Sequence, residues 1–236
     1  ERTEDPRERA EQHHKIGLYC LENNRDQDAL AAFEASIDAD PSFLNSLEHL
    51  ASLLGEDQEW GELERIYQKV YDAFQSDSPS RQETRLLAEI QHRMALLYRD
   101  HLGDPGSALA ALDKALEHRP RQVATLLLAG EVAEELDDPG QALSYLRRAV
   151  DLKPKNVDIY HRMFDLAHRY EEPHTARHAA SATMVLEDAT EQETEFYEKS
   201  YDHSVPPHRR PLDETSWTWL RCDEGDEGVE RVMRAL

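Results

Sequence analysis

Histidine is the residue type best suited to chemistry in this chain, which contains 12 histidines. An imidazole side chain can bind a metal ion or act as a general base near neutral pH. His174 and His178 lie four residues apart, so a helix would place them on one face. A structural zinc site needs four converging ligands, and no cysteine–histidine cluster with suitable spacing accompanies this pair. The pattern favours surface histidines over a metal site, and no cofactor is expected.

Motifs that would build an active site are missing from the sequence. It has no Gly-rich phosphate-binding loop, no nucleophile elbow and no zinc-protease motif. The neighbouring pairs His13–His14 and Glu171–Glu172 point in different directions on a helix, so neither converges on a substrate. We therefore expect a protein that is not an enzyme, with any enzymatic activity carried by a missing part of a longer chain.

The chain is strongly acidic, since 27 Lys and Arg against 49 Asp and Glu give a formal net charge of −22. Nucleic acid is not expected as a partner, because neutralising phosphates requires clustered Lys and Arg. The same reason disfavours an anionic membrane surface, and no apolar run is long enough for membrane insertion. Two interpretations of the acidic surface remain open: it keeps an extended molecule soluble, or it attracts basic partners.

The two cysteines, Cys20 and Cys222, lie far apart and do not suggest a disulfide framework. Cys20 falls on the inward face of an expected helix, where cysteine acts as a small hydrophobic residue. The chain begins at Glu1 without methionine, which indicates an excised or processed piece of a longer protein. The compartment is therefore left open, with the cytoplasm favoured.

A fixed period runs through the middle of the chain. Ala108, Ala142 and Ala176 recur with a 34-residue period, and a proline stands three residues before each alanine. A period in this range indicates a solenoid, in which stacked helix pairs bury their apolar faces only against their neighbours. The sequence is rich in helix-favouring residues, and no stretch alternates with strand periodicity. The fold class is therefore all-α.

The order of residue types within each period resembles the tetratricopeptide repeat, in multi-repeat arrays of the bacterial type. Small residues lie on both helices of a pair, where they let the helices approach closely. They are Gly17, Ala51, Ala95 and Gly130 on the first helices, and Ala29, Ala108, Ala142 and Ala176 on the second. The resemblance covers about residues 10 to 188. It implies a right-handed superhelical solenoid of antiparallel helix pairs.

The expected helix pairs follow from this register. Asp104, Asp138 and Ser78 each precede a proline and are expected to cap a helix start. The interval from Leu63 to Ala108 is longer than one period, and the extra residues are expected in two places. One lies in the turn 99–103 and the rest surround 76–80. The pairs are expected at 8–23 with 26–39, 42–55 with 59–75, 80–102 with 105–118, 121–136 with 139–152, and 156–170 with 173–187.

Two regions are expected in the chain. Residues 1–188 should form an array of about five pairs, divided as 10–43, 44–78, 79–122, 123–156 and 157–188. Residues 189–236 should form a helical C-terminal capping or linker element, because the 34-residue register is lost after Leu186. Within it, helices are expected at 191–201, which is a candidate sixth first helix, around Trp217 and over 229–236.

The resemblance also implies a binding groove, because the first helices of tetratricopeptide repeats form the concave surface. Mapped by register, the groove residues are Asn45, Glu48, His92, Leu96, Arg99, Leu127, Glu131, Glu134, Asp158, His161, Asp165 and His168. In the first pair, His14 and Leu18 do not match the Lys and Asn of the subclass that binds C-terminal carboxylates. The acidic groove residues predict a basic or amphipathic ligand, a protein or peptide segment contacted chiefly across the third to fifth pairs.

Three functions remain open at this point. The first is a non-enzymatic scaffold that binds a protein or peptide in the concave groove. The second is a regulatory arm of a larger enzyme or transcription regulator. The third is a self-stacking structural array, and the oligomeric state is not predicted.

Overall fold

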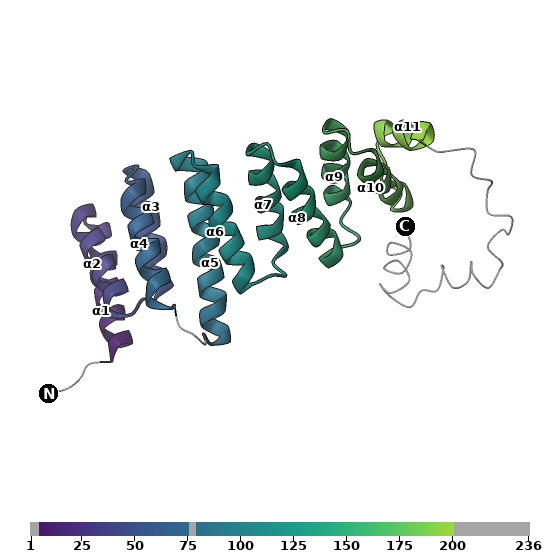
Figure 1. The fold of residues 1–236 in the computed structure, drawn as a ribbon. Coiled ribbons are helices and arrows are strands. Elements are labelled where there is room, and N and C mark those ends of the chain that lie inside the picture. Colours follow the sequence, from purple (N-terminus) through teal and green to yellow (C-terminus); the bar gives the residue numbers. More distant parts are fainter. Residues whose placement is uncertain (1–4, 76–78, 201–236) are drawn as a thin grey trace. The chain divides into compact units, whose positions relative to one another are not determined.

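The computed structural model describes residues 5–75 and 79–200. Within these ranges the regular structure is helical and contains no strand. Within each pair the two helices run antiparallel and pack against each other (Figure 1). The helices are α1 (Pro6–Glu22), α2 (Asp26–Ala39), α3 (Leu44–Glu56), α4 (Trp60–Ala73), α5 (Arg81–Leu97), η1 (Tyr98–Leu102), α6 (Pro105–His118), α7 (Val123–Glu135), α8 (Pro139–Leu152), α9 (Val157–Arg169), α10 (Pro173–Val185) and α11 (Glu191–Ser200). The all-α prediction is confirmed, as is the arrangement in helix pairs.

Two of the three predicted caps are present. Asp104 accepts a hydrogen bond from the Ser107 N–H at 2.9 Å, and Asp138 accepts one from the Gln141 N–H at 2.9 Å. In both helices proline follows the cap at the first helical position, where no N–H is needed. The third prediction, that Ser78 caps a helix beginning at Pro79, is wrong about where that helix begins. Ser78 itself lies outside the described residues. Helix α5 begins at Arg81, after Ser80.

Ser80 and Glu83 explain that start. The Glu83 N–H donates to the Ser80 Oγ at 3.2 Å, and the Ser80 N–H donates to the Glu83 carboxylate at 2.6 Å. This reciprocal capping box satisfies two N–H groups at the helix start. Pro79 therefore precedes the cap instead of following it.

The turn inside each pair repeats the 34-residue period in the backbone. One residue per turn has a left-handed conformation, with φ between 54° and 63°, and these residues are Asn24, Gln58, Gly103, Asp137 and Glu171. Apart from the predicted insertion between Gln58 and Gly103, they keep this period throughout. Such a residue ends a helix by letting the chain turn back along it. The register is thus visible in the dihedral angles as well as in the sequence.

The single extra residue predicted in the turn 99–103 is accommodated by η1, a π-helical turn. A π-turn absorbs one inserted residue without breaking the helix. Gly103 then ends η1 with φ +63°, and its N–H donates to the Tyr98 carbonyl. Helix α5 and η1 together span the predicted first helix of 80–102.

The chain divides into two compact units, residues 1–120 and 121–236. The first contains α1 to α6, and the described part of the second contains α7 to α11. The right-handed superhelical course through all pairs stays a prediction, as do the boundaries of the five pairs. Cys20 is buried, as predicted, with 5% of its surface exposed.

Helix α11 corrects the prediction that the register is lost after Leu186. It begins at Glu191, one full period after the start of α9 at Val157. The α9 start itself comes one full period after that of α7 at Val123. Helix α11 is therefore a sixth first helix in register. The helices predicted around Trp217 and over 229–236 lie outside the described residues.

Candidate protein-binding face

The predicted groove residues lie on the first helix of each pair or just after it. We call these side chains, on α3, α5, η1, α7 and α9, the first-helix face. In the first unit, Asn45 and Glu48 of α3 are exposed, whereas His92 and Leu96 of α5 are half-buried. Arg99 lies in η1, where its Nε is 2.6 Å from an oxygen of Asp100.

Arg93 is a contact residue that the sequence analysis missed. Its guanidinium lies 3.0 Å from the Glu89 carboxylate on the same helix and 3.5 Å from the Glu48 carboxylate on α3. Arg93 therefore links two successive first helices. The spacing of four residues from Glu89 was a usable signal for the first of these pairs.

A small pocket of about 230 Å³ lies beside Arg93. Its walls come from α3, α4, α5 and η1, and the lining residues are Ala51, Trp60, Leu63, Tyr67, Arg93, Leu96, Leu97 and His101. The Trp60 and His101 rings stack with centroids 3.7 Å apart. The apolar lining with one cation suits an apolar side chain of a ligand.

Burial disfavours the charged form of His92. The pKa of His92 is lowered from 6.5, chiefly because burial disfavours the charged imidazolium, although Glu89 opposes this shift. His92 is therefore neutral at pH 7 and gains its charge only below its ordinary pKa. It adds little positive charge to the face near neutral pH.

In the second unit, ion pairs reduce the negative field expected from Glu131 and Glu134. Glu131 accepts a hydrogen bond from Arg162 of α9 at 2.7 Å, and Glu134 pairs with Arg169 of the same helix. These contacts join α7 to α9, and both carboxylates already have a cation beside them. Asp158 and Asp165 are exposed, and neither has an ion pair among the described residues.

Helix α11 contacts the two histidines predicted on α9. The His161 Nδ1 lies 2.7 Å from the Glu193 carboxylate, and Glu193 is only 1% exposed. The His168 ring stacks on Phe164 at 5.5 Å and meets the Phe196 edge at 5.2 Å. Both histidines therefore hold α11 in place.

Leu127 of α7 is half-buried. It is the one apolar residue among the predicted groove positions of the second unit. Of the polar positions predicted on the same helix, Glu131 and Glu134 carry the ion pairs described above.

Glu193 is anchored from two directions. Its carboxylate accepts the Thr190 N–H at 2.8 Å at the start of α11, in addition to the contact with His161. Burial raises the pKa of Glu193, but these hydrogen bonds lower it more, so the net pKa is lowered. The sequence analysis missed this residue.

His14 of α1 is half-buried and packs against residues of α2 and α3. Its Nδ1 lies 3.0 Å from the Ser46 Oγ of α3, and its ring contacts Phe33, Phe43 and His49. The pKa of His14 is lowered, mainly by burial and also by His49.

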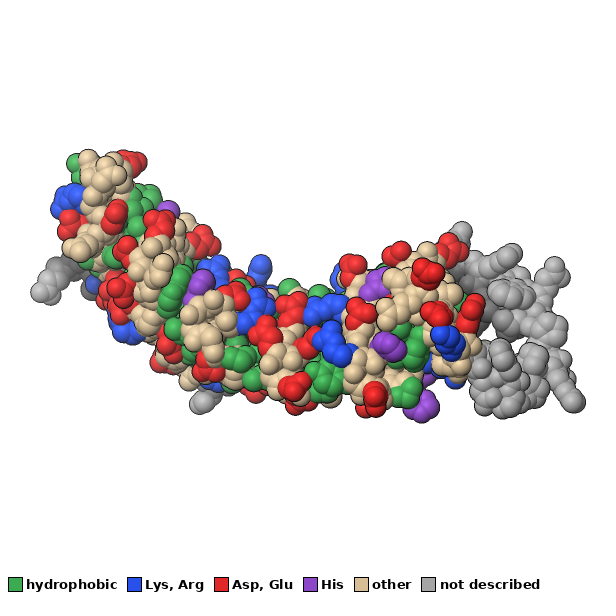
Figure 2. Space-filling view, turned by 90° about the horizontal axis from the view of Figure 1, so that it is seen from above, with side chains coloured by type: hydrophobic (Ala, Val, Ile, Leu, Met, Phe, Trp, Pro, Cys, Tyr) green, Lys and Arg blue, Asp and Glu red, His purple; other side chains and the backbone are tan. Residues whose placement is uncertain are grey.

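Over residues 5–75 and 79–200, no group of three or more His, Cys, Asp or Glu side chains converges to hold a metal ion. No helix within that part of the chain is both long enough and apolar enough to cross a membrane. On the face seen in Figure 2, acidic side chains are scattered over the described surface with basic side chains between them.

Helix pairs with a shared turn geometry at a fixed period define a helical repeat protein. Residues 94–157 match the family model described as tetratricopeptide repeat. The match identifies tetratricopeptide repeats over these residues, and this fold supports a role in binding proteins. A sequence search of curated proteins found no significant match.

Solved structures that share the fold include the following three. A double mutant of MamA RS-1 is 16% identical, with a TM-score of 0.53 over 76% of this chain and 94% of that chain. A tetratricopeptide repeat protein from Parabacteroides merdae is 14% identical, with a TM-score of 0.54 over 81% of this chain and 72% of that chain. The C-terminal part of a repeat protein from Cytophaga hutchinsonii is 14% identical, with a TM-score of 0.55 over 80% and 73%. At these identities the similarity concerns the fold alone.

Proposed function

We propose that this protein is a non-enzymatic scaffold that binds a segment of a partner protein on its first-helix face. The observation that carries the proposal is the pocket of about 230 Å³ beside Leu96. Two successive first helices contribute to it through Ala51 and Leu96. An apolar pocket between repeats, bordered by polar residues, is a suitable anchor point for one side chain of a ligand.

The ligand is an amphipathic or basic segment. Its apolar side chain fills the pocket. Exposed carboxylates attract its cations, and they are Asp158 and Asp165 in the second unit and, in the first, Glu48, which also has Arg93 at 3.5 Å. Glu131 and Glu134 contribute less charge, because arginines already neutralise them. The remaining groove residues, Asn45, His92, Arg99 and Leu127, border the path of the segment within their own units.

The test is selection of peptides from a random library on the immobilised protein, followed by titration of the selected peptides. Leu96→Lys places a charge at the pocket and should weaken binding by about tenfold or more, as expected for a central anchor residue. The matched control is Ala110→Lys on the exposed face of α6, which introduces the same side chain away from the pocket. It should leave the affinity unchanged.

A second arm tests the electrostatic part. Asp165→Lys is preferable to substitutions at Glu131 or Glu134, which would break ion pairs with α9. Binding of a basic peptide should weaken in this variant and also at high salt, because salt screens exposed charges. If selected peptides bind Leu96→Lys and Ala110→Lys equally well, and salt has no effect, the first-helix face is not the binding surface.

A further inference from the structure

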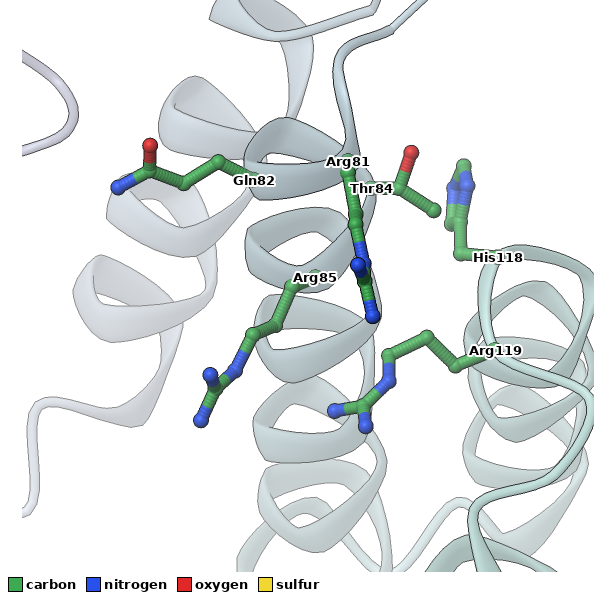
Figure 3. A pocket seen from close by; sticks show the side chains of 6 residues that line it. All are labelled: Arg81, Gln82, Thr84, Arg85, His118 and Arg119. Carbon is green, nitrogen blue, oxygen red and sulfur yellow. The ribbon is translucent and has the colours of Figure 1, made fainter.

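A cluster of basic side chains lies where α5 begins and α6 ends, apart from the first-helix face. The cluster lines an open pocket of about 680 Å³ and consists of Arg81, Gln82, Thr84, Arg85, His118 and Arg119 (Figure 3). All six residues belong to the first compact unit. We call this set the arginine cluster.

The three arginines differ from six other arginines in the described part of the chain. A carboxylate partner lies beside each of Arg25, Arg65, Arg93, Arg99, Arg162 and Arg169. By contrast, Arg81, Arg85 and Arg119 have no ion pair within residues 5–75 and 79–200. In a chain with a net charge of −22, three neighbouring arginines without carboxylate partners mark a place for an external anion.

Among the described residues, two carboxylates lie close to the cluster in sequence, and neither forms an ion pair with its arginines. Glu83 lies on the same helix, where its carboxylate accepts the Ser80 N–H at 2.6 Å, and it makes no ion pair with the three arginines. Glu117 precedes His118 on α6, is exposed and makes no ion pair with the three arginines. His118 is held by the Tyr71 hydroxyl at 3.2 Å, which fixes one wall of the pocket.

We propose that the arginine cluster binds an acidic segment of a partner protein through its Asp and Glu side chains. A guanidinium group pairs with a carboxylate through two parallel N–H···O bonds, which gives both energy and orientation. Figure 3 shows the three guanidinium groups spread along the pocket and not directed at one point. That spread suits several carboxylates along a segment better than one compact phosphate group. The exposed Gln82 amide adds a neutral donor beside them.

The test uses the full chain and a short fluorescent peptide of alternating Glu and Asp, titrated at low salt. Arg81→Gln with Arg119→Gln should weaken binding by about tenfold or more, because two charge-assisted pairs are lost. The matched control is Arg7→Gln with Arg9→Gln on α1, which changes the net charge equally through two exposed arginines. The control should bind as the wild type does.

Equal loss in the two double variants, or no binding by the wild type, would overturn the proposal. Three further arms identify other occupants. Two of these arms use a phosphoserine peptide and vesicles of anionic lipid. If either binds through the cluster while the Glu–Asp peptide does not bind, the assignment to carboxylates is contradicted. The chain also has its own acidic segment, Asp223–Glu227. If Asp223→Asn, Glu224→Gln, Asp226→Asn and Glu227→Gln together raise the peptide affinity, that segment and not a partner is the occupant.

This test is independent of the proposed function, because the arginine cluster and the Leu96 pocket share no residue. Weaker binding of the selected peptides to Leu96→Lys does not predict how that variant binds the Glu–Asp peptide. Likewise, weaker binding of the Glu–Asp peptide to the arginine variant does not predict how it binds the selected peptides. The two proposals can therefore fail separately.

Discussion

Gly17 should tolerate no side chain, although glycine is a poor helix former. A Cβ atom at Gly17 would lie 2.5, 2.7 and 2.8 Å from three ring atoms of Phe33. Ordinary carbon contacts are about 3.5–4.0 Å, so the ring would have to move by roughly 1 Å. Phe33 is fully buried and stacks on His49, with ring centroids 4.9 Å apart, so it has little room to move.

The expected cost of Gly17→Ala follows from two opposing terms. Overpacking of a buried ring costs about 2–3 kcal/mol, whereas replacing glycine by alanine in a helix gains about 1 kcal/mol. Gly17→Ala should therefore lower the free energy of unfolding by about 1–2 kcal/mol.

Gly130 is the matched control, because it occupies the same register position in the fourth pair. A Cβ atom there would lie 3.5 Å from the nearest atom of Leu146, which is an ordinary contact. Leu146 stands where the first pair has Phe33. Gly130→Ala should therefore be stabilising by about 0.5–1 kcal/mol through helix propensity alone.

Urea unfolding followed by circular dichroism measures both variants. The double variant Gly17→Ala with Phe33→Leu places alanine against leucine, the same two residues that meet in the fourth pair of the Gly130→Ala variant. Its free energy of unfolding should be higher than the sum of the losses in the two single variants predicts. If Gly17→Ala is as stabilising as Gly130→Ala, the packing of α1 against α2 is not as described.

Three further changes test other parts of the fold. Ala142 has no exposed surface, so Ala142→Leu should lower the unfolding free energy by about 1–3 kcal/mol, and an unchanged melting curve would mean that the register is misassigned. Gly103 has φ +63° with open space around it, so Gly103→Ala should cost about 1–2 kcal/mol through backbone strain alone, and an unchanged unfolding curve would contradict the left-handed turn. Glu193 has a lowered pKa, so its stabilising contribution is present above its ordinary pKa and is lost as the pH falls through the lowered value. Glu193→Gln should be less stable than wild type at about pH 7, with the difference shrinking toward about pH 3, and a difference that does not depend on pH would contradict the role of this carboxylate.

The helix pairs were predictable because their determinants are local. Asp104 and Asp138 cap their helices through groups three residues away, and each is followed by proline. Glycine or alanine at close crossings repeats at the same period. These signals lie within one repeat and need no knowledge of the tertiary structure.

The contacts between repeats were not predictable in the same way. Glu131 pairs with Arg162 and Glu134 with Arg169, and the two pairs cross the repeat by different offsets in sequence. Which of the acidic and basic side chains meet depends on rotamers and on how α7 lies against α9. The packing of α11 was not predictable either. Its contacts with α9 are made by Glu193 and Phe196, and the helix contains none of the glycines, alanines or prolines that mark the other pairs.

Methyl NMR of the protein with a selected partner peptide tests the central claim most directly. Leu96 and Leu127 report on the first-helix face, and Val150 reports on the second helix α8. Binding on the first-helix face predicts shifts at the Leu96 methyls, extending to Leu127 if the segment reaches the second unit, while Val150 stays unchanged. Shifts at Val150 with none at Leu96 would contradict the account.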